Sequence, residues 1–220
     1  LNALGLPGPG IDNFTKEILS SELWKFRRPI GISIGGDTRT EYVENVRKIE
    51  MTINNKYEQY FYELNISCPN TENGATICQQ PEKLESLLVD LKMELEKVIS
   101  IKVSPDVPNA TLLNIGEIAS LFDNVIINAG NTKFITPLEA GVEKPNFSME
   151  GGGLSGAPIF QRTLEMVGLF SNFKNPIMAT GGISSIHHVH AAKKSGASLF
   201  GMATSLVLNP YCIPKINSNL

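Results

Sequence analysis

The sequence has few cysteines and no concentration of charge of either sign. Its three cysteines, Cys68, Cys78 and Cys212, are too few and too scattered for a disulfide framework or a four-thiolate metal site, and they suit a reducing compartment. The 19 Lys and Arg residues nearly balance the 22 Asp and Glu residues, and neither kind forms a block. The sequence therefore predicts no nucleic acid and no membrane surface as a partner, and indicates small molecules or other proteins.

Long hydrophobic runs are also missing. No apolar run approaches the roughly 18 residues that a membrane span needs, and the first residues lack the charged-then-apolar pattern of an export signal. The expected location is cytoplasmic. The chain begins with Leu1 instead of Met and continues into a Gly/Pro-rich stretch at residues 5–10, which indicates a fragment.

Short apolar runs alternate with longer amphipathic segments along the whole chain. This alternation is typical of α/β proteins with a parallel sheet, and a hydrophobic content of 42% is enough for a sizeable core. Because no change in composition interrupts it, we expect a single domain over residues 1–220. The predicted strands are residues 30–34, 60–66, 99–103, 124–128, 176–179 and 197–202. The predicted helices are residues 40–53, 81–98, 110–121, 159–170 and 184–195.

The ends of the predicted strands favour a barrel over an open sheet. Nearly every strand ends in small or hydrogen-bonding residues, and in a (β/α)₈ barrel these ends converge on one mouth, where active sites lie. The expected fold is therefore a (β/α)₈ TIM barrel of the α/β class. About six of its eight βα units are present, so the barrel is incomplete at the N-terminus and stops within its last helix.

Two segments near the C-terminus predict a phosphate site. Residues 180–184 follow a strand and open a helix, so the backbone N–H groups of Gly181 and Gly182 can approach an anion. Ala203 and Thr204 follow the last strand, and phosphate sites in barrels frequently form from the loops after the last two strands. The alternative is that these segments are only helix-entry turns.

The densest polar cluster is residues 65–70, Asn-Ile-Ser-Cys-Pro-Asn, after the second strand. Two amides, a hydroxyl and a thiol at a strand end suit a planar ligand rich in carbonyl and N–H groups. Cys68 is a candidate base or nucleophile, because a thiol with an ordinary pKa of about 8.5 is partly ionised at neutral pH. The alternative is a buried structural cysteine, which we expect for Cys78 and Cys212.

Lys102 lies within a strand whose other residues are apolar. Because a buried ammonium group needs a compensating anion, we expect it to face an electron-rich cofactor or a substrate oxygen. The alternative is an edge lysine that reaches water. Residues 128–132 repeat the pattern of amides at a strand end, and the long segment that ends near Gly156 is expected to serve binding. The three histidines at residues 187–190 are interpreted as a solvated helix face, so no metal site is predicted.

Taken in order and spacing, five motifs resemble those of the dihydroorotate dehydrogenases. They are residues 64–70 (Leu-Asn-Ile-Ser-Cys-Pro-Asn), 101–105 (Ile-Lys-Val-Ser-Pro), 131–132 (Asn-Thr), 152–156 (Gly-Gly-Leu-Ser-Gly) and 181–184 (Gly-Gly-Ile-Ser). The resemblance covers essentially the whole chain. It implies an FMN-containing barrel that oxidises dihydroorotate to orotate in pyrimidine biosynthesis. Residues 2–7 are similar to the family segment after the second barrel unit, so the first two strands and their substrate-facing lysine are absent from this sequence.

The resemblance also implies roles for individual residues. Cys68 would be the base that takes the proton from C5 of dihydroorotate while hydride leaves C6 for flavin N5. A cysteine at this place is similar to class 1, the soluble group, in contrast to the membrane-associated class 2. The implied substrate-binding residues are Asn2, Asn65, Asn70, Asn131 and Thr132. The implied FMN-binding residues are Asn65, Lys102 near the flavin N1–O2 edge, Gly156, Gly181, Gly182, Ala203 and Thr204.

Some positions depart from the family pattern. Ala203 stands where a glycine is usual, and residues 71–74 differ from the Pro-Gly-Lys-Pro of fumarate-using class 1A, whereas Ser33 is similar to that subclass. The subclass and the electron acceptor therefore stay open. A homodimer and an electron-transfer subunit are the expected protein partners. The alternative functions are the pyrimidine-reducing FMN barrel of a dihydropyrimidine dehydrogenase and a non-catalytic barrel that binds a phosphate ligand.

Overall fold

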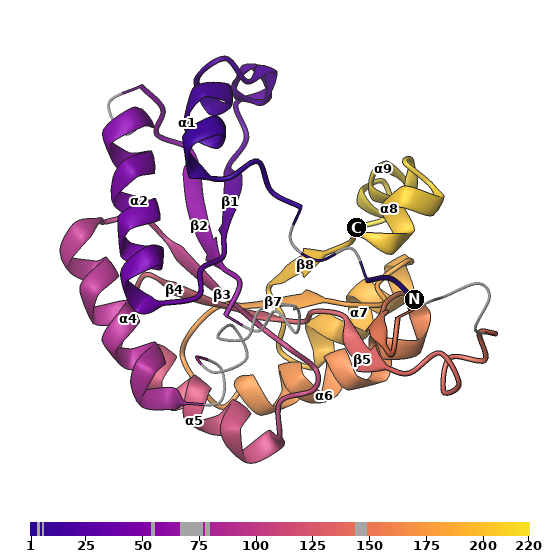
Figure 1. Cartoon of the computed structure of the whole chain (residues 1–220). Coiled ribbons are helices and arrows are strands. Elements are labelled where there is room, and N and C mark those ends of the chain that lie inside the picture. The colour runs from indigo at the N-terminus through magenta and orange to yellow at the C-terminus, as the bar shows by residue number, and fades with distance from the viewer. Residues whose placement is uncertain (4, 6, 54–55, 67–76, 78–79, 144–148) are drawn as a thin grey trace.

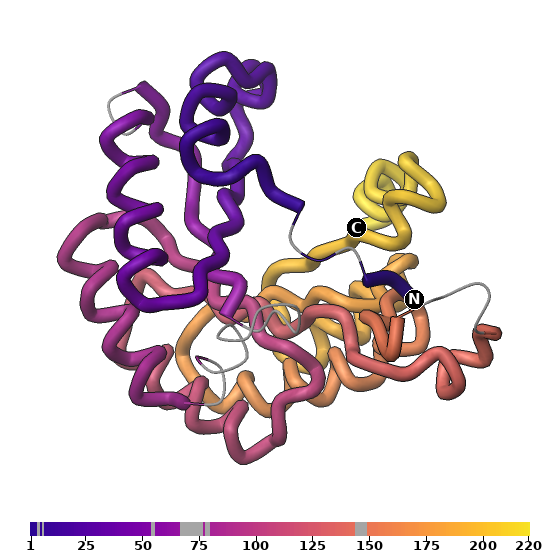
Figure 2. Tube along the Cα trace, in the orientation of Figure 1, coloured from indigo at the N-terminus to yellow at the C-terminus, as the bar shows by residue number. Residues whose placement is uncertain are grey.

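Six parallel strands form a strongly curled sheet in the computed structural model of the chain (Figure 1). The structure describes residues 1–3, 5, 7–53, 56–66, 77, 80–143 and 149–220. The strands neighbour one another in chain order: β1 (Ile30–Ile34), β2 (Tyr60–Leu64), β3 (Ile99–Val103), β4 (Val125–Ala129), β7 (Ile177–Thr180) and β8 (Leu199–Gly201). The trace in Figure 2 shows the same barrel, which curls without closing. The predicted fold, an incomplete (β/α) barrel, is confirmed.

Helices follow the strands in turn and cover the outer side of the sheet (Figure 1). They are α2 (Arg39–Ile53), α4 (Pro81–Glu94), α5 (Asn109–Ala119), α6 (Phe160–Phe170) and α7 (Ile186–Lys194). Their bounds agree closely with those predicted, except that α4 ends four residues early, because Leu95 adopts an extended backbone. Within the described part of the chain, no helix is both long enough and apolar enough to span a membrane.

Side chains alternate between two environments along each strand, as the pleat of a strand requires. Ile101, Ile127 and Ala179 belong to the set that packs under the helices, and each is fully buried in the hydrophobic core. The alternate set faces the inside of the curled sheet, and toward the carboxyl ends of the strands it is polar, with Lys102 and Asn128 paired in register on β3 and β4. This alternation separates an apolar core outside the sheet from a polar surface inside it.

Several elements lie outside the predicted pattern. The long segment after β4 contains an antiparallel pair, β5 (Lys133–Ile135) with β6 (Gly152–Leu154), and Asn2 joins it through reciprocal backbone hydrogen bonds with Gly153 of 3.0 and 2.7 Å. This pair brings the N-terminal residues to the mouth of the barrel. The further elements are α1 (Ile11–Leu19), η1 (Glu22–Phe26), η3 (Ala157–Ile159), α8 (Thr204–Leu208) and α9 (Cys212–Asn217).

Asn175 fixes the connection between α5, β4 and β7. Its buried side-chain Nδ2 lies 3.0, 3.1 and 3.0 Å from the carbonyl oxygens of Ala119, Phe122 and Val125. We expect Asn175→Ala to lower the free energy of unfolding by about 2–4 kcal/mol, because buried carbonyl groups would lose their donor. Urea denaturation measures this change. The matched control is Asn172→Ala, because the exposed Asn172 amide bonds only to Leu169 among the described residues. An equal loss in both variants would contradict the role assigned to Asn175.

Candidate active site

A cavity of about 250 Å³ lies at the carboxyl ends of β3, β4, β7 and β8, and we call it the strand-end pocket. Ligand pockets of α/β barrels are expected at this end of the strands. Most of the site residues predicted from the sequence line it: Lys102, Asn131, Thr132, Gly156, Gly181, Gly182, Ala203 and Thr204. The fold therefore brings Lys102 of β3 together with residues from four separate loops.

Three backbone segments meet at one end of the strand-end pocket. A β-carbon built at Gly182 would lie 2.6 Å from Cβ of Phe160 and 2.9 Å from the carbonyl oxygen of Gly156, and one at Gly156 would lie 3.4 Å from Cγ2 of Thr204. Gly156 and Gly182 have φ values of +83° and +72°, which favour glycine. The three segments therefore approach one another closely enough to act on one small group.

Thr180 supplies an unused polar atom to this pocket. Its Oγ1 is buried and has no hydrogen-bond partner among the described residues. The adjoining strand end is tightly packed around it, since a β-carbon at Gly201 would lie 2.3 Å from that hydroxyl. A buried polar atom without a partner is costly, and a ligand in the pocket would satisfy it. This observation fits a bound group with hydrogen-bonding capacity.

Lys102 is paired with a carboxylate inside the sheet. Its Nζ lies 3.6 Å from Oε1 of Glu63, and the two side chains are 22% and 19% exposed. Oε2 of Glu63 accepts a hydrogen bond of 2.8 Å from Nδ2 of Asn128. The sequence analysis missed Glu63. The available signal was a lone carboxylate at an alternating position of the otherwise apolar residues 60–64. The anion that the buried lysine requires is therefore supplied by the protein itself.

Asn65 follows β2 and is held by its backbone. Its N–H donates to the carbonyl of Ile34 at 2.9 Å, and its own carbonyl accepts from the hydroxyl of Tyr42 at 2.9 Å. The side chain is 6% exposed, and its Oδ1 has no partner among the described residues. Because Leu64 of β2 pairs with Ile101 of β3, Asn65 lies at the level of Lys102, the next residue of β3. A rigid backbone thus presents an unused acceptor at the barrel mouth.

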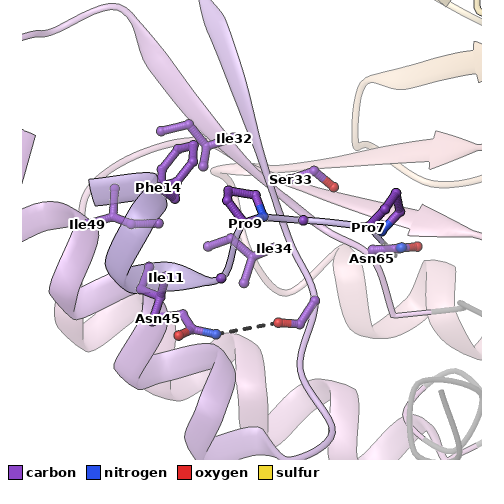
Figure 3. Close-up of a pocket in the computed structure, with 13 residues that line it drawn as sticks. Pro7, Pro9, Ile11, Phe14, Ile32, Ser33, Ile34, Asn45, Ile49 and Asn65 are labelled. Carbon is purple, nitrogen blue, oxygen red and sulfur yellow. Dashed lines mark hydrogen bonds between the residues drawn. The ribbon is translucent and has the colours of Figure 1, made fainter. Parts of the chain in front are cut away.

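A second cavity, of about 490 Å³, lies beside the edge strand β1 (Figure 3). Ser33 and Asn65 lie on one side of it, and Phe14 and Ile49 on the other. Its remaining lining is mostly apolar: Pro7, Gly8, Pro9, Gly10, Ile11, Ile32, Ile34, Gly35 and Asn45. Asn65 is the residue that links this cavity to the predicted site.

Asn131 and Thr132 are fixed at the rim of the strand-end pocket. Oδ1 of Asn131 accepts a hydrogen bond of 2.8 Å from the backbone N–H of Thr132. Nδ2 of Asn2 donates to the carbonyl of Gly153 at 3.3 Å, and a β-carbon at Gly153 would lie 2.3 Å from Oγ1 of Thr132. Gly153 thereby brings Asn2 and Thr132 together, although the two residues are far apart in the sequence.

The predicted residues do not all share one cavity. Asn65 lines the cavity beside β1, and Asn2 is on neither lining, since its amide is bonded to the β6 backbone. Cys68 and Asn70 lie outside the described residues. The roles of these four residues stay predictions, as do the roles of the residues that line the strand-end pocket.

Comparison with known proteins gives consistent results. A sequence profile of the dihydroorotate dehydrogenase family matches residues 1–220. The catalytic subunit of dihydroorotate dehydrogenase B (NAD⁺) from Bacillus cereus strain G9842 is 32% identical over 228 residues, which cover 100% of this chain and 70% of the relative. The dihydroorotate dehydrogenase (quinone) of Acinetobacter baylyi is 32% identical over 222 residues, covering 94% of this chain and 64% of the relative.

Solved structures show the same fold. The crystal structure of a dihydroorotate dehydrogenase from Eimeria tenella in complex with ferulenol superposes with a TM-score of 0.81 at 22% identity, covering 99% of this chain and 65% of the other. The ligand-free enzyme from the same organism gives a TM-score of 0.80, covering 99% of this chain and 68% of the other.

Proposed function

Because this chain belongs to the dihydroorotate dehydrogenase family, we propose that it oxidises dihydroorotate to orotate in pyrimidine biosynthesis, with bound FMN as the cofactor. One observation supports this function above the others. The strand-end pocket combines a cationic side chain, Lys102, with glycine turns around residues 156 and 182, so a positive charge and backbone that no side chain covers line the same cavity.

The residues of the strand-end pocket fit FMN. Gly156, Gly182 and Thr204 would hold its phosphate through backbone N–H groups and a hydroxyl, and the Thr180 hydroxyl would gain the partner it lacks. Ala203, which stands where the family usually has glycine, has a φ of −121°, outside the left-handed region that favours glycine, so the sign of φ at this position does not require a glycine. When bound, FMN supplies the acceptor for the substrate hydride.

Lys102 and the amides around it would orient the reacting partners. A positive charge held in place before the reaction stabilises negative charge that develops next to it, without reorganisation of the protein. Asn65 would accept a hydrogen bond through its unused Oδ1, and Asn131 and Thr132 would contact the substrate ring from the opposite rim. Asn2 and Asn70 complete the proposed substrate contacts, and Cys68 is the proposed base that removes the C5 proton.

Visible spectroscopy tests the function. We expect the purified protein to bind FMN and its absorbance to bleach when dihydroorotate is added without oxygen. A folded protein that is colourless after incubation with excess FMN and removal of the free cofactor would contradict the proposal and favour a non-catalytic barrel. Bleaching by dihydrouracil but not by dihydroorotate would favour a dihydropyrimidine dehydrogenase instead.

The electron acceptor and the protein partners need separate measurements. Relatives named for NAD⁺ and for quinone are equally similar to this chain. One of them is named as a catalytic subunit, and by analogy we propose an electron-transfer subunit, together with a homodimer. Reoxidation of the reduced protein by fumarate, by a quinone, or by NAD⁺ with added candidate subunit distinguishes the acceptors. Sedimentation analysis measures the oligomeric state.

A further inference from the structure

Glu63 is the most connected charged side chain inside the described sheet. Its Oε1 lies 3.5 Å from Oγ of Ser33 on β1 and 3.6 Å from Nζ of Lys102 on β3. Its Oε2 accepts the 2.8 Å hydrogen bond from Asn128 on β4. One carboxylate on β2 therefore contacts polar side chains from three other strands, and it holds them at the mouth of the barrel.

The pair of Glu63 and Lys102 is well placed to act on a neighbouring charge. Both side chains are about four-fifths buried, so solvent and salt screen them weakly. Their separation of 3.6 Å is longer than a good hydrogen bond, whereas Asn128 bonds directly to the other carboxylate oxygen. The carboxylate is thus anchored by the amide, and it attracts the ammonium group mainly through its charge.

We propose that Glu63 is a positioning residue: by drawing the Lys102 ammonium group toward itself, it weakens the effect of the lysine charge on the flavin and thereby lowers the reduction potential of bound FMN. The role rests on the proposed function, because it requires FMN in the strand-end pocket. Hydride transfer places negative charge on the flavin, and a nearby cation favours that state. A carboxylate fixed beside the same cation opposes it. The protein would thereby set how readily the reduced cofactor passes its electrons on.

The alternative is a purely structural role, in which Glu63 only ties the strands together. This role predicts a loss of stability when the contacts are removed, and no change in the potential of the cofactor. The two interpretations therefore differ in a quantity that does not depend on the rate of turnover.

The first test is Glu63→Gln in the FMN-loaded protein. Glutamine keeps the size of the side chain and an oxygen that can accept from Asn128, but it removes the charge. We expect the reduction potential of FMN to rise, with reduced FMN gaining about tenfold in affinity relative to oxidised FMN, which corresponds to about 30 mV for a two-electron couple. Equilibration with a redox dye measures it. An unchanged or lower potential would overturn the proposal.

A double-mutant cycle tests whether Glu63 acts through Lys102. Lys102→Gln alone should lower the potential. In that background, we expect Glu63→Gln to produce less than half of the shift that it produces alone. If the whole shift persists without the lysine, the carboxylate acts directly on the flavin, and the positioning role is wrong.

Glu50→Gln is the matched control. Oε1 of Glu50 on α2 accepts hydrogen bonds of 2.7 Å from the hydroxyls of both Tyr60 and Tyr62, whose side chains face away from the inside of the sheet. Burial, and then the hydrogen bond to Glu50, raise the pKa of both tyrosines, so both stay protonated donors. We expect this variant to melt at a lower temperature and to keep the potential of the unchanged protein.

The outcomes separate the two proposals. If the unchanged protein binds no FMN, the proposed function fails. If it binds FMN, bleaches with dihydroorotate, and its potential is the same in the Glu63→Gln variant, the function stands and only the role of Glu63 is wrong.

Discussion

Replacing Cys68 with serine is expected to slow the reduction of bound FMN by dihydroorotate about 10²–10⁴-fold at neutral pH, the range that a general base contributes. A thiol with a pKa of about 8.5 is partly ionised at that pH, whereas a serine hydroxyl is almost wholly protonated. FMN should stay bound, because serine keeps the size of the side chain and most of the proposed cofactor contacts come from other segments. Anaerobic stopped-flow absorbance measures the rate.

The control for this experiment is Cys212→Ser. Cys212 begins α9 and is buried, and it lines neither the strand-end pocket nor the cavity beside β1. We expect this variant to reduce FMN at the unchanged rate. The Cys68→Ser rate should also rise more steeply with pH than that of the unchanged protein. Normal flavin reduction at neutral pH in the Cys68 variant would show that this residue is not the base.

Gly182→Ala is expected to weaken FMN binding at least about 100-fold, equivalent to about 3 kcal/mol. Its φ of +72° is unfavourable for alanine, and the added β-carbon would lie 2.6 Å from Cβ of Phe160 and 2.9 Å from the carbonyl of Gly156. Cβ of Phe160 is attached directly to the main chain, and the carbonyl oxygen of Gly156 is part of it. Neither atom can move aside by a side-chain rotation, so relief of the clash must displace the segments that form the proposed phosphate site. Fluorescence titration with FMN measures the affinity.

Gly168→Ala is the matched control for this change. Gly168 lies within α6, and a β-carbon there would meet no heavy atom within 4 Å. Because alanine is the better helix former, we expect a gain of up to about 1 kcal/mol in the free energy of unfolding and an unchanged FMN affinity. Equal FMN affinity in both glycine variants would contradict the proposed phosphate site.

Most of the sheet could be predicted because its strands are nearly continuous apolar runs. The run at residues 99–103 is buried by helices on one side and carries its two polar residues, Ser100 and Lys102, on the other, so the sequence pattern and the alternation of the strand agree. The β5–β6 pair could not be predicted in this way. Its strands are three residues each, Lys-Phe-Ile and Gly-Gly-Leu, too short for any periodicity, and they form because distant segments meet across a long connection.

The residue types of the site could be predicted from the sequence, but several of the contacts between them could not. Gly182 could be selected from the sequence because it follows a predicted strand and opens a helix, and Gly156 from the family resemblance; the structure gives both of them positive φ values that other residues avoid. Their close approach, in which a β-carbon built at Gly182 would lie 2.9 Å from the carbonyl oxygen of Gly156, could not be predicted, because it depends on how α6 and the turn after β7 pack. Likewise, the placement of Asn2 beside Thr132 requires the backbone bridge to Gly153.

The sequence by itself determined that this chain alternates strands and helices, places polar groups where the strands end, and carries a lysine that needs an anion. Each of these properties depends on local spacing, which the order of residues contains directly. Only the tertiary structure decided that the anion is Glu63, because that choice depends on the stagger between adjacent strands. Charge pairs of this kind form through space, and their partners are set by how the sheet curls.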